Sequence, residues 1–525
     1  MKLKNVELEL GKIYQSLVEA ETLATRSGSM VHTDYQLSAT NLVRYLVLRR
    51  YDLRFLHDSL SELGVSALRS SEGYVWRNVT DALKLVKLLR GEVWSPADAP
   101  SIGYKKSKKI IRKHSNRLFN ARDQRHRTEI MVTMPAEAAV DKILVKNLIY
   151  EGMEIARINL SHGDVGEWQA MVNNIKQAAS ELKMPCKIYM DLSGPKIRTG
   201  SIQLKEKNKK GKIKVTDKIG LKNGDHLVLT KKQLNAKKPK YGSSGELIRP
   251  AKISVSLPAI IDDAEIGHRI LFDDGKIEGS IIQKKKDELE VVIVNTPQLV
   301  KLGSEKGINL PDSHLQLPSL TENDLTNLPF VVSNADMLGY SFVRNADDVK
   351  KLYSELNKYQ SEHLGIIFKV ENKDAFENLP LILLEAMKRP GIGVMIARGD
   401  LAVELGPERI AEVQDQILWI CEAAHVPVIW ATQVLENLSK TGQASRAEIT
   451  DAAKSARAEC VMLNKGPYVV SSVRLLKNIL FKMESHTTKK KSTMRSLKIA
   501  QKAMAKLGSN EVFPVIPEAD GLQSE

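Results

Sequence analysis

Two short stretches of the 525-residue chain combine an apolar run with charged side chains at its end. In residues 392–404, an apolar run that reads as a buried strand is followed by Gly399 and Asp400. In residues 366–372, the two-residue period of a strand places Lys369 and Glu371 on the same side. An ammonium group and two carboxylates at neighbouring strand ends are the groups that a metal and phosphoryl site requires.

Other polar side chains follow apolar segments in the same way, namely Arg157, Asn159, Ser161, Asp191, Arg198, Ser341, Arg344, Thr432 and Gln433. The set is rich in arginine, carboxylate and hydroxyl groups, which suits phosphoryl transfer, where catalysis rests on positioning and charge stabilisation. Glu371 and Asp400 could bind Mg²⁺ through oxygen ligands. Each residue also has a structural alternative, in an ion pair (Lys369 with Glu371, Arg157 with Asp191) or a helix cap (Asp400, Thr432).

A repeated pattern of apolar and helical segments from Thr128 onward would position these residues. Its strands are predicted at Glu129–Thr133, Glu154–Asn159, Lys187–Asp191, Met337–Ser341, Ile366–Val370, Val394–Ala397, Val428–Thr432 and Cys460–Leu463. Eight strand–helix units are what a closed parallel barrel requires, and active sites of such barrels lie at the C-terminal ends of the strands. The predicted fold class is therefore α/β, a TIM-type (β/α)8 barrel.

Composition and apolar patterning divide the chain into residues 1–120, a helical N-terminal extension; 121–199, the first part of the barrel; 200–306, an inserted β-rich lid; 307–484, the second part of the barrel; and 485–525, a charged tail. Residues 104–127 read as a basic linker. In the insert, Asp273-Asp274-Gly275-Lys276 predicts a hairpin turn. An insert on a loop at the catalytic end of a barrel is a candidate for a mobile lid.

The net charge is +15, and much of it lies in lysine-rich runs. Aromatic residues do not interleave with these lysines, so we interpret the runs as solvated faces and expect no nucleic-acid partner. Cys186, Cys421 and Cys460 are far apart and odd in number, which favours reduced thiols over a disulfide or zinc site. No apolar run reaches the ~20 residues of a membrane span, so no membrane partner and a cytoplasmic location are expected.

Several motifs resemble, in order, those of the pyruvate kinase family: EIARINLSHG (154–163), DLSGPKIRTG (191–200), LFDDG (271–275), KGINLP (306–311), FKVEN (368–372), ARGDL (397–401) and ATQVLE (431–436). The resemblance covers residues 128–483. It implies a barrel with a small β-barrel lid and phosphoryl transfer from phosphoenolpyruvate to ADP, giving pyruvate and ATP in glycolysis, with Mg²⁺ as cofactor.

The resemblance also implies roles for individual residues. Lys369, Arg157 and Thr432 would be catalytic. The enolpyruvate substrate would be bound by Arg157, Lys369, Gly399, Asp400 and Thr432. Mg²⁺ would be held by Glu371 and Asp400. The nucleotide side would comprise Asn159, His162, Arg198 and Lys306. A monovalent cation site is matched by Asn159, Ser161, Asp191 and the carbonyl of Leu192, with Ser341 and Arg344 as support residues.

The chain departs from the family pattern at several places. After the first strand it has Met134–Glu137, and after the eighth it has Asn464–Pro467, where the family's glutamate and threonine are missing. The usual C-terminal regulatory domain is not expected here, nor is control by sugar phosphates through it, and the N-terminal helices are additional. Lys196 stands where potassium-dependent members carry glutamate, so K⁺ could bind but is not expected to be required.

Three functions remain open at this stage. The first is a pyruvate kinase, and a homo-oligomer is left open for its assembly. The second is a pyruvate kinase-like binding or regulatory protein with weak or no transfer activity, motivated by the loops at residues 134–137 and 464–467. The third is another metal-dependent barrel enzyme acting on pyruvate or an enol phosphate, which does not explain the lid motifs.

Overall fold

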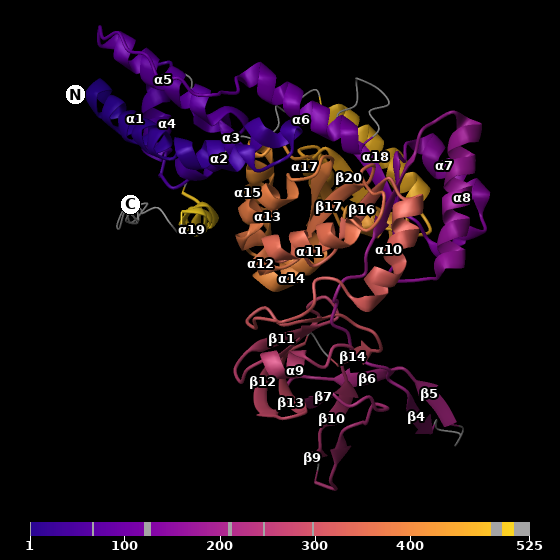
Figure 1. Cartoon of the computed structure of the whole chain (residues 1–525). Helices are drawn as coiled ribbons and strands as arrows, with labels where there is room; N and C mark the ends of the chain where they lie inside the picture. The colour runs from indigo at the N-terminus through magenta and orange to yellow at the C-terminus, as the bar shows by residue number, and fades with distance from the viewer. Residues whose placement is uncertain are drawn as a thin grey trace.

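The computed structural model describes residues 2–65, 68–119, 128–207, 213–244, 247–296, 299–484 and 496–508. Figure 1 shows a barrel at the centre, the N-terminal helices on one side of it and the inserted β domain at its other end. Within the described residues, no helix combines the length and the apolar character needed to cross a lipid bilayer.

Eight parallel strands form the closed barrel, in the order β1 (Glu129–Thr133), β2 (Ile155–Asn159), β3 (Lys187–Asp191), β16 (Met337–Tyr340), β17 (Gly365–Val370), β18 (Ile392–Ala397), β19 (Val428–Ala431) and β20 (Cys460–Leu463). All eight predicted strands are confirmed, with ends that differ by at most a few residues. The strands are buried on both faces, so side chains that point either way are mostly buried. This explains why the strands read as continuous apolar runs.

The helices around the barrel are α7 (Lys142–Glu151), α8 (Val165–Leu182), α10 (Glu322–Asn334), α11 (Ala346–Leu356), α12 (Lys373–Glu377), α13 (Leu379–Ala386), α14 (Arg398–Leu405), α15 (Ile410–Ala423), α16 (Glu436–Thr441), α17 (Arg446–Ser455) and α18 (Val469–Glu484). Residues next to the first turn determine where several of these helices begin. Thr321 with Asp324, and Ser445 with Glu448, form capping boxes at α10 and α17. The rebuilt loop after β1 contains the 3₁₀ helix η4 (Ala136–Ala139).

The inserted domain contains β4 (Leu204–Lys207), β5 (Ile213–Thr216), β6 (Lys218–Leu221), β7 (His226–Thr230), β8 (Lys240–Tyr241), β9 (Leu247–Arg249), β10 (Ala251–Ser254), α9 (Ile260–Asp263), β11 (Arg269–Phe272), β12 (Ile277–Lys285), β13 (Glu288–Asn295), β14 (Val300–Gly303) and β15 (Ile308–Asn309). The predicted hairpin turn is confirmed, because it joins the antiparallel strands β11 and β12. Asp273, Asp274 and Gly275 all have positive φ there.

The insert is a β domain, and its described strands do not form one continuous hydrogen-bonded sheet. Its strands form a six-stranded sheet, β10-β7-β13-β12-β11-β15, and three separate two-stranded sheets. One apolar core nevertheless joins the main sheet to the β6–β14 pair, since Ile219 and Leu302 pack with Ile253 and Ile270. Side-chain packing rather than a continuous hydrogen-bonded ladder therefore unites the domain.

The N-terminal extension is helical, as predicted, with α1 (Lys2–Glu19), α2 (Glu21–Ser29), η1 (Thr33–Tyr35), α3 (Gln36–Leu48), α4 (Arg54–Glu62), η2 (Leu68–Ser70), η3 (Glu72–Tyr74), α5 (Val75–Leu89) and α6 (Tyr104–Leu118). The interpretation of residues 104–127 as a basic linker is wrong up to Leu118, because α6 is a helix with one buried side. Residues 120–127 lie outside the described part of the chain.

The end of α6 closes the N-terminal end of the barrel. Leu118 and Phe119 are buried in one apolar cluster with inward-facing residues of the strands, among them Met131 and Met395. Gly365 and Gly393 make room for Leu118, because a Cβ at either position would lie within 3.0 Å of its side chain. The extension thus supplies part of the barrel core.

Buried polar contacts also join the extension to the barrel. His425, between α15 and β19, is fully buried, and its ring nitrogens lie 3.1 Å from Ser38 Oγ and 3.0 Å from the Gly73 carbonyl oxygen. The Asn41 amide donates to the carbonyl oxygen of Ala423 at 2.9 Å. Because buried polar groups need partners, these contacts fix one arrangement of the extension on the barrel.

The charged tail contains one further helix, α19 (Lys498–Leu507), which lies between the extension and the barrel in Figure 1. The Leu497 amide donates to the Arg49 carbonyl oxygen at 3.0 Å, and Lys502 pairs with Glu377 of α12 at 2.9 Å. The remaining tail residues, 485–495 and 509–525, lie outside the described part of the chain.

Candidate active site

Lys369, near the C-terminal end of β17, is the buried cation at the centre of the predicted site. Its side chain is only 9% exposed. The ammonium lies 3.0 Å from Glu371 Oε1 and 3.5 Å from Asp191 Oδ2, and it donates to Ser341 Oγ at 2.8 Å. The structural alternative of a Lys369–Glu371 ion pair is therefore present, in a cluster that brings together predicted residues from three strand ends.

Asp191, at the end of β3, is fully buried and surrounded by donors. Arg157 of β2 donates to Asp191 Oδ2 from Nε at 2.7 Å and lies 2.5 Å from it through a second guanidinium nitrogen. Arg157 also donates to Thr133 Oγ1 at 2.9 Å, and the Tyr189 hydroxyl donates to Asp191 Oδ1. This network holds the guanidinium at the mouth of the barrel.

The charges of this cluster depend on one another. Burial by itself would raise the pKa of Asp191, but the positive charges of Lys369 and Arg157 outweigh burial and hold the pKa below its ordinary value. Burial would likewise lower the pKa of Lys369, but Asp191 and Glu371 raise it above its ordinary value. Burial raises the pKa of Glu371, and Lys369 offsets only part of that effect.

The segment after β16 supports Lys369 and Glu371 from the side. Ser341 Oγ accepts from Lys369 and donates to the Leu192 carbonyl oxygen at 2.7 Å. The Phe342 amide donates to Glu371 Oε2 at 2.7 Å, and Phe342 has φ of 55°, which is strained for an aromatic residue. Strain of this kind persists where surrounding contacts enforce it, and here it aims an amide at the carboxylate.

Asp400 lies in the first turn of α14, next to the predicted carboxylate-binding residues. The Gly399 amide donates to Thr432 Oγ1 at 2.8 Å, and Thr432 has φ of 63°. The alternative of Thr432 as a helix cap is wrong, because the residue before α16 is Leu435 and no side chain caps that helix. Asp400 does not cap α14 either, since that position is Ala397 without a side-chain cap bond.

Lys196, in the segment between β3 and the insert, binds Asp400. Its ammonium donates to both carboxylate oxygens, at 2.8 Å to Oδ1 and 3.1 Å to Oδ2. The Lys196 side chain therefore points to Asp400 rather than to solvent. The contact joins residues 204 positions apart in the chain.

Glu371 and Asp400 form a donor set that suits a hard divalent cation. They follow the hydrogen-bonded neighbours β17 and β18, and the charge of Asp400 contributes to the raised pKa of Glu371. Each carboxylate is matched by an ammonium, from Lys369 and Lys196 respectively. Two close carboxylates that attract cations in this way fit the oxygen preference of Mg²⁺.

The residues predicted for the nucleotide lie at the rim of the site. Arg198 donates to the Glu305 carbonyl oxygen at 3.1 Å, and Lys306 pairs with Asp273 at 3.0 Å. His162 is exposed, and its pKa is lowered by partial burial and by the charges of Lys465 and Arg198. The altered loop after β20 therefore brings an additional positive charge to this rim.

Of the four residues predicted for a monovalent cation, Asn159, Asp191 and Leu192 have oxygens that accept hydrogen bonds within the protein. Asn159 Oδ1 accepts from the Ser161 amide at 3.2 Å. The Leu192 carbonyl oxygen accepts from Ser341, and both carboxylate oxygens of Asp191 have donors. The residues lie together as predicted, but the oxygens of these three already serve protein groups.

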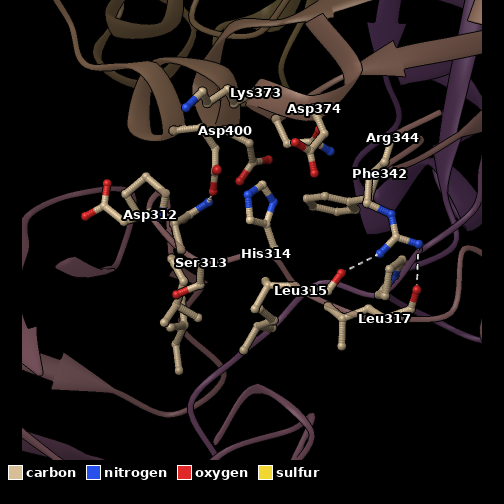
Figure 2. A pocket seen from close by; sticks show the side chains of 18 of the residues that line it. Asp312, Ser313, His314, Leu315, Leu317, Phe342, Arg344, Lys373, Asp374 and Asp400 are labelled. Atoms are coloured by element: carbon tan, nitrogen blue, oxygen red, sulfur yellow. Dashed lines mark hydrogen bonds between the residues drawn. The ribbon is translucent and has the colours of Figure 1, made fainter. Parts of the chain in front are cut away.

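A cavity of about 350 Å³ adjoins Asp400 and separates the barrel from the segment that returns from the inserted domain. Figure 2 shows Asp312, Ser313, Leu315 and Leu317 on one side and Phe342, Lys373, Asp374 and Asp400 on the other, with the His314 ring between them. Arg344 fixes this segment, because it donates to the carbonyl oxygens of Leu315 at 3.1 Å and Leu317 at 2.5 Å.

Comparison with known proteins agrees with this geometry. Residues 125–473 match the family description "Pyruvate kinase, barrel domain". The chain belongs to the pyruvate kinase family. It is 32% identical over 370 residues to a pyruvate kinase of Geobacillus stearothermophilus, which covers 69% of this chain and 57% of that protein. Pyruvate kinase of Bacillus licheniformis is 32% identical over 376 residues, covering 70% and 58% respectively.

A solved structure shows the same relationship. The crystal structure of a pyruvate kinase from Cryptosporidium parvum matches with a TM-score of 0.58 and 28% identity, over 69% of this chain and 70% of that chain. The chain spans less than two thirds of the length of the curated pyruvate kinases described above.

Glu404 is a residue of this pyruvate kinase-family site that the sequence reading did not single out. It lies on the same helix as Asp400 and lines the cavity. The Asn309 amide of β15 donates to Glu404 Oε1 at 2.8 Å, which joins the inserted domain to the barrel. Burial raises the pKa of Glu404 to about 7, with a smaller contribution from Asp400.

We expect Glu404→Gln to remove a pH dependence of stability. Because the pKa rises from 4.5 to about 7 on folding, the folded state binds the proton more tightly. The carboxyl therefore destabilises the fold as pH rises through this window, by about 3 kcal/mol above pH 7. Glutamine keeps an acceptor for Asn309 and has no charge.

Thermal unfolding at pH 5 and pH 8 tests this expectation. The wild type should lose more stability than Glu404→Gln on going to pH 8, whereas Glu408→Gln, at a nearby exposed position, should behave as the wild type does. An equal loss in the wild type and Glu404→Gln would contradict the assignment.

Other site residues were also missed by the sequence reading. Tyr189 and Asp191 are two residues apart on β3, so the strand period could have shown that both face the interior. Thr133 could also have been predicted as a site residue, because it ends β1 and the C-terminal ends of barrel strands meet at one face. The positive φ of Phe342 had no sequence signal, since aromatic residues rarely adopt that conformation.

Proposed function

We propose that the chain transfers the phosphoryl group of phosphoenolpyruvate to ADP and forms pyruvate and ATP. The observation that carries the proposal is the buried ammonium of Lys369 between Asp191 and Glu371, at the catalytic end of a barrel of this family. The carboxylates of Asp191 and Glu371 keep that ammonium charged despite its burial, and a fixed positive charge in a site of low polarity stabilises a moving phosphoryl group.

Each residue would have a separate role in binding the substrate or in the transfer. Arg157, held by Asp191 and Thr133, would bind the phosphate. Lys369 would stabilise the phosphoryl group in transfer and the enolate that remains. The Gly399 amide at the start of α14, together with Thr432 after β19, would bind the carboxylate, as helix N-termini bind anions.

Glu371 and Asp400 would hold Mg²⁺, which when bound supplies positive charge that offsets the charge of the phosphoryl group and orients the substrate. His162, Arg198 and Lys306 would lie on the nucleotide side, at the rim formed by the inserted domain.

A coupled assay of pyruvate formation tests the proposal. Pyruvate should appear only when phosphoenolpyruvate, ADP and Mg²⁺ are all present. The rival function, a binding protein without efficient transfer, is favoured by one observation, the added charge of Lys465 beside His162. Calorimetric binding of phosphoenolpyruvate with no pyruvate formed would support that rival and contradict the proposal.

We also expect activity without added K⁺. The oxygens of Asn159, Asp191 and Leu192 already accept from protein donors, and the Lys196 ammonium gives the site a positive charge that belongs to the protein itself. Turnover should be the same in K⁺-free buffer with and without added KCl, whereas Lys196→Glu should become dependent on K⁺. A wild type that stays inactive until K⁺ is added would show that the lysine does not replace the ion.

A further inference from the structure

We infer that Lys196 is an internal counter-ion that occupies the Asp400 carboxylate in the metal-free protein and competes with the divalent cation for it. The ammonium contacts both carboxylate oxygens, at 2.8 and 3.1 Å. A cation that takes Asp400 as a ligand therefore competes with this ammonium for the negative charge of the carboxylate. The inference rests on the proposed role of Asp400 as a metal ligand.

The surrounding charges explain why an internal cation belongs at this position. Asp400 lies close enough to Glu371 and Glu404 to raise the pKa of both carboxyls. The other nearby cation, Lys369, is engaged by Asp191 and Glu371. Without Lys196 the Asp400 carboxylate would have no ion-pair partner among the described residues, which is costly for a carboxylate close to other acidic groups in a half-buried site.

Lys196 is also placed so that it can leave. Its side chain is 24% exposed and that of Asp400 is 18% exposed, so water reaches the pair. Lys196 lines the cavity of Figure 2 together with Asp374 and Glu404, and these carboxyls offer the displaced ammonium another negative environment. The exchange of ammonium for a metal ion therefore needs no rearrangement of the barrel.

The competition has a measurable consequence for metal affinity. Removing the ammonium frees Asp400, so Lys196→Met should bind a divalent cation more tightly than the wild type. Lys373→Met is the matched control, because Lys373 lines the same cavity, is exposed and has no ion pair among the described residues. The control removes the same charge without freeing a carboxylate.

The experiment is a titration of the full-length protein with Mn²⁺, without substrates, in which free Mn²⁺ is followed by electron paramagnetic resonance. Lys196→Met should tighten binding by roughly tenfold, the scale of one partly buried ion pair, and Lys373→Met by less than about twofold. Equal or weaker binding by Lys196→Met, or equal tightening by both variants, would overturn the inference.

Two further measurements separate this inference from the proposed function. Asp400→Asn should weaken Mn²⁺ binding, and in the double variant the effect of Lys196→Met should vanish. If Asp400→Asn leaves Mn²⁺ binding unchanged, the metal site itself is wrong. In thermal unfolding, Lys196→Met should melt below the wild type with EDTA and gain more from Mn²⁺, because tighter binding stabilises the folded state more.

Discussion

Replacing Lys369 by methionine is expected to reduce kcat for pyruvate formation by roughly a thousandfold, the scale seen when a preorganised charge-stabilising group is lost. Methionine keeps the length and apolar stem of lysine but removes the ammonium that lies 3.0 Å from Glu371 and 3.5 Å from Asp191. The coupled assay measures the effect. Lys373→Met, at an exposed position on the next helix, should retain activity close to that of the wild type.

The same substitution should also change stability in a pH-dependent way. Lys369 helps to hold the pKa of Asp191 below its ordinary value of 3.8, so this contribution to stability is present above about pH 4 and is lost as pH falls further. In the variant, the buried Asp191 carboxylate loses the positive charge of Lys369 and keeps only that of Arg157. The free energy of unfolding should therefore fall by about 3 kcal/mol near pH 7.

Thermal unfolding from pH 7 to pH 3 measures this effect. The deficit of Lys369→Met relative to the wild type should shrink as the variant's carboxyls become protonated. A deficit that is independent of pH, or normal turnover by the variant, would contradict the role assigned to Lys369.

Glu371→Gln and Asp400→Asn are each expected to lower kcat/KM by roughly a hundredfold and to raise the Mg²⁺ concentration needed for half-maximal activity by about tenfold or more. Both substitutions keep the size of the side chain and remove the charge that a hard cation requires. Glutamine at position 371 retains an oxygen acceptor for the Phe342 amide, so the fold of that segment should persist.

Initial rates across a Mg²⁺ titration measure both effects. Glu404→Gln, on the same helix as Asp400, is the matched control for loss of a nearby carboxyl. Near-normal activity of either Glu371→Gln or Asp400→Asn at low Mg²⁺ would exclude that residue as a metal ligand.

The sequence by itself determined the barrel and much of the site. The strands are buried on both faces, so continuous apolar runs marked all eight of them. Lys369 and Glu371 lie on one strand, and the two-residue period alone placed them on one side. The Asp273–Lys276 turn was likewise local, because turn geometry depends on a few adjacent residues.

Only the tertiary structure decided which groups pair across the chain. Lys196 meets Asp400 across 204 positions, and His425 meets Ser38 across 387. Local patterns cannot specify such contacts, because they arise from the packing of elements that share no sequence period. The same holds for the end of α6, a helix whose basic sequence suggested a linker and whose last residues fill the barrel floor. Long-range pairing also decided how the strands of the inserted domain divide among its sheets, because the alternation of a strand's side chains does not specify which strand it pairs with.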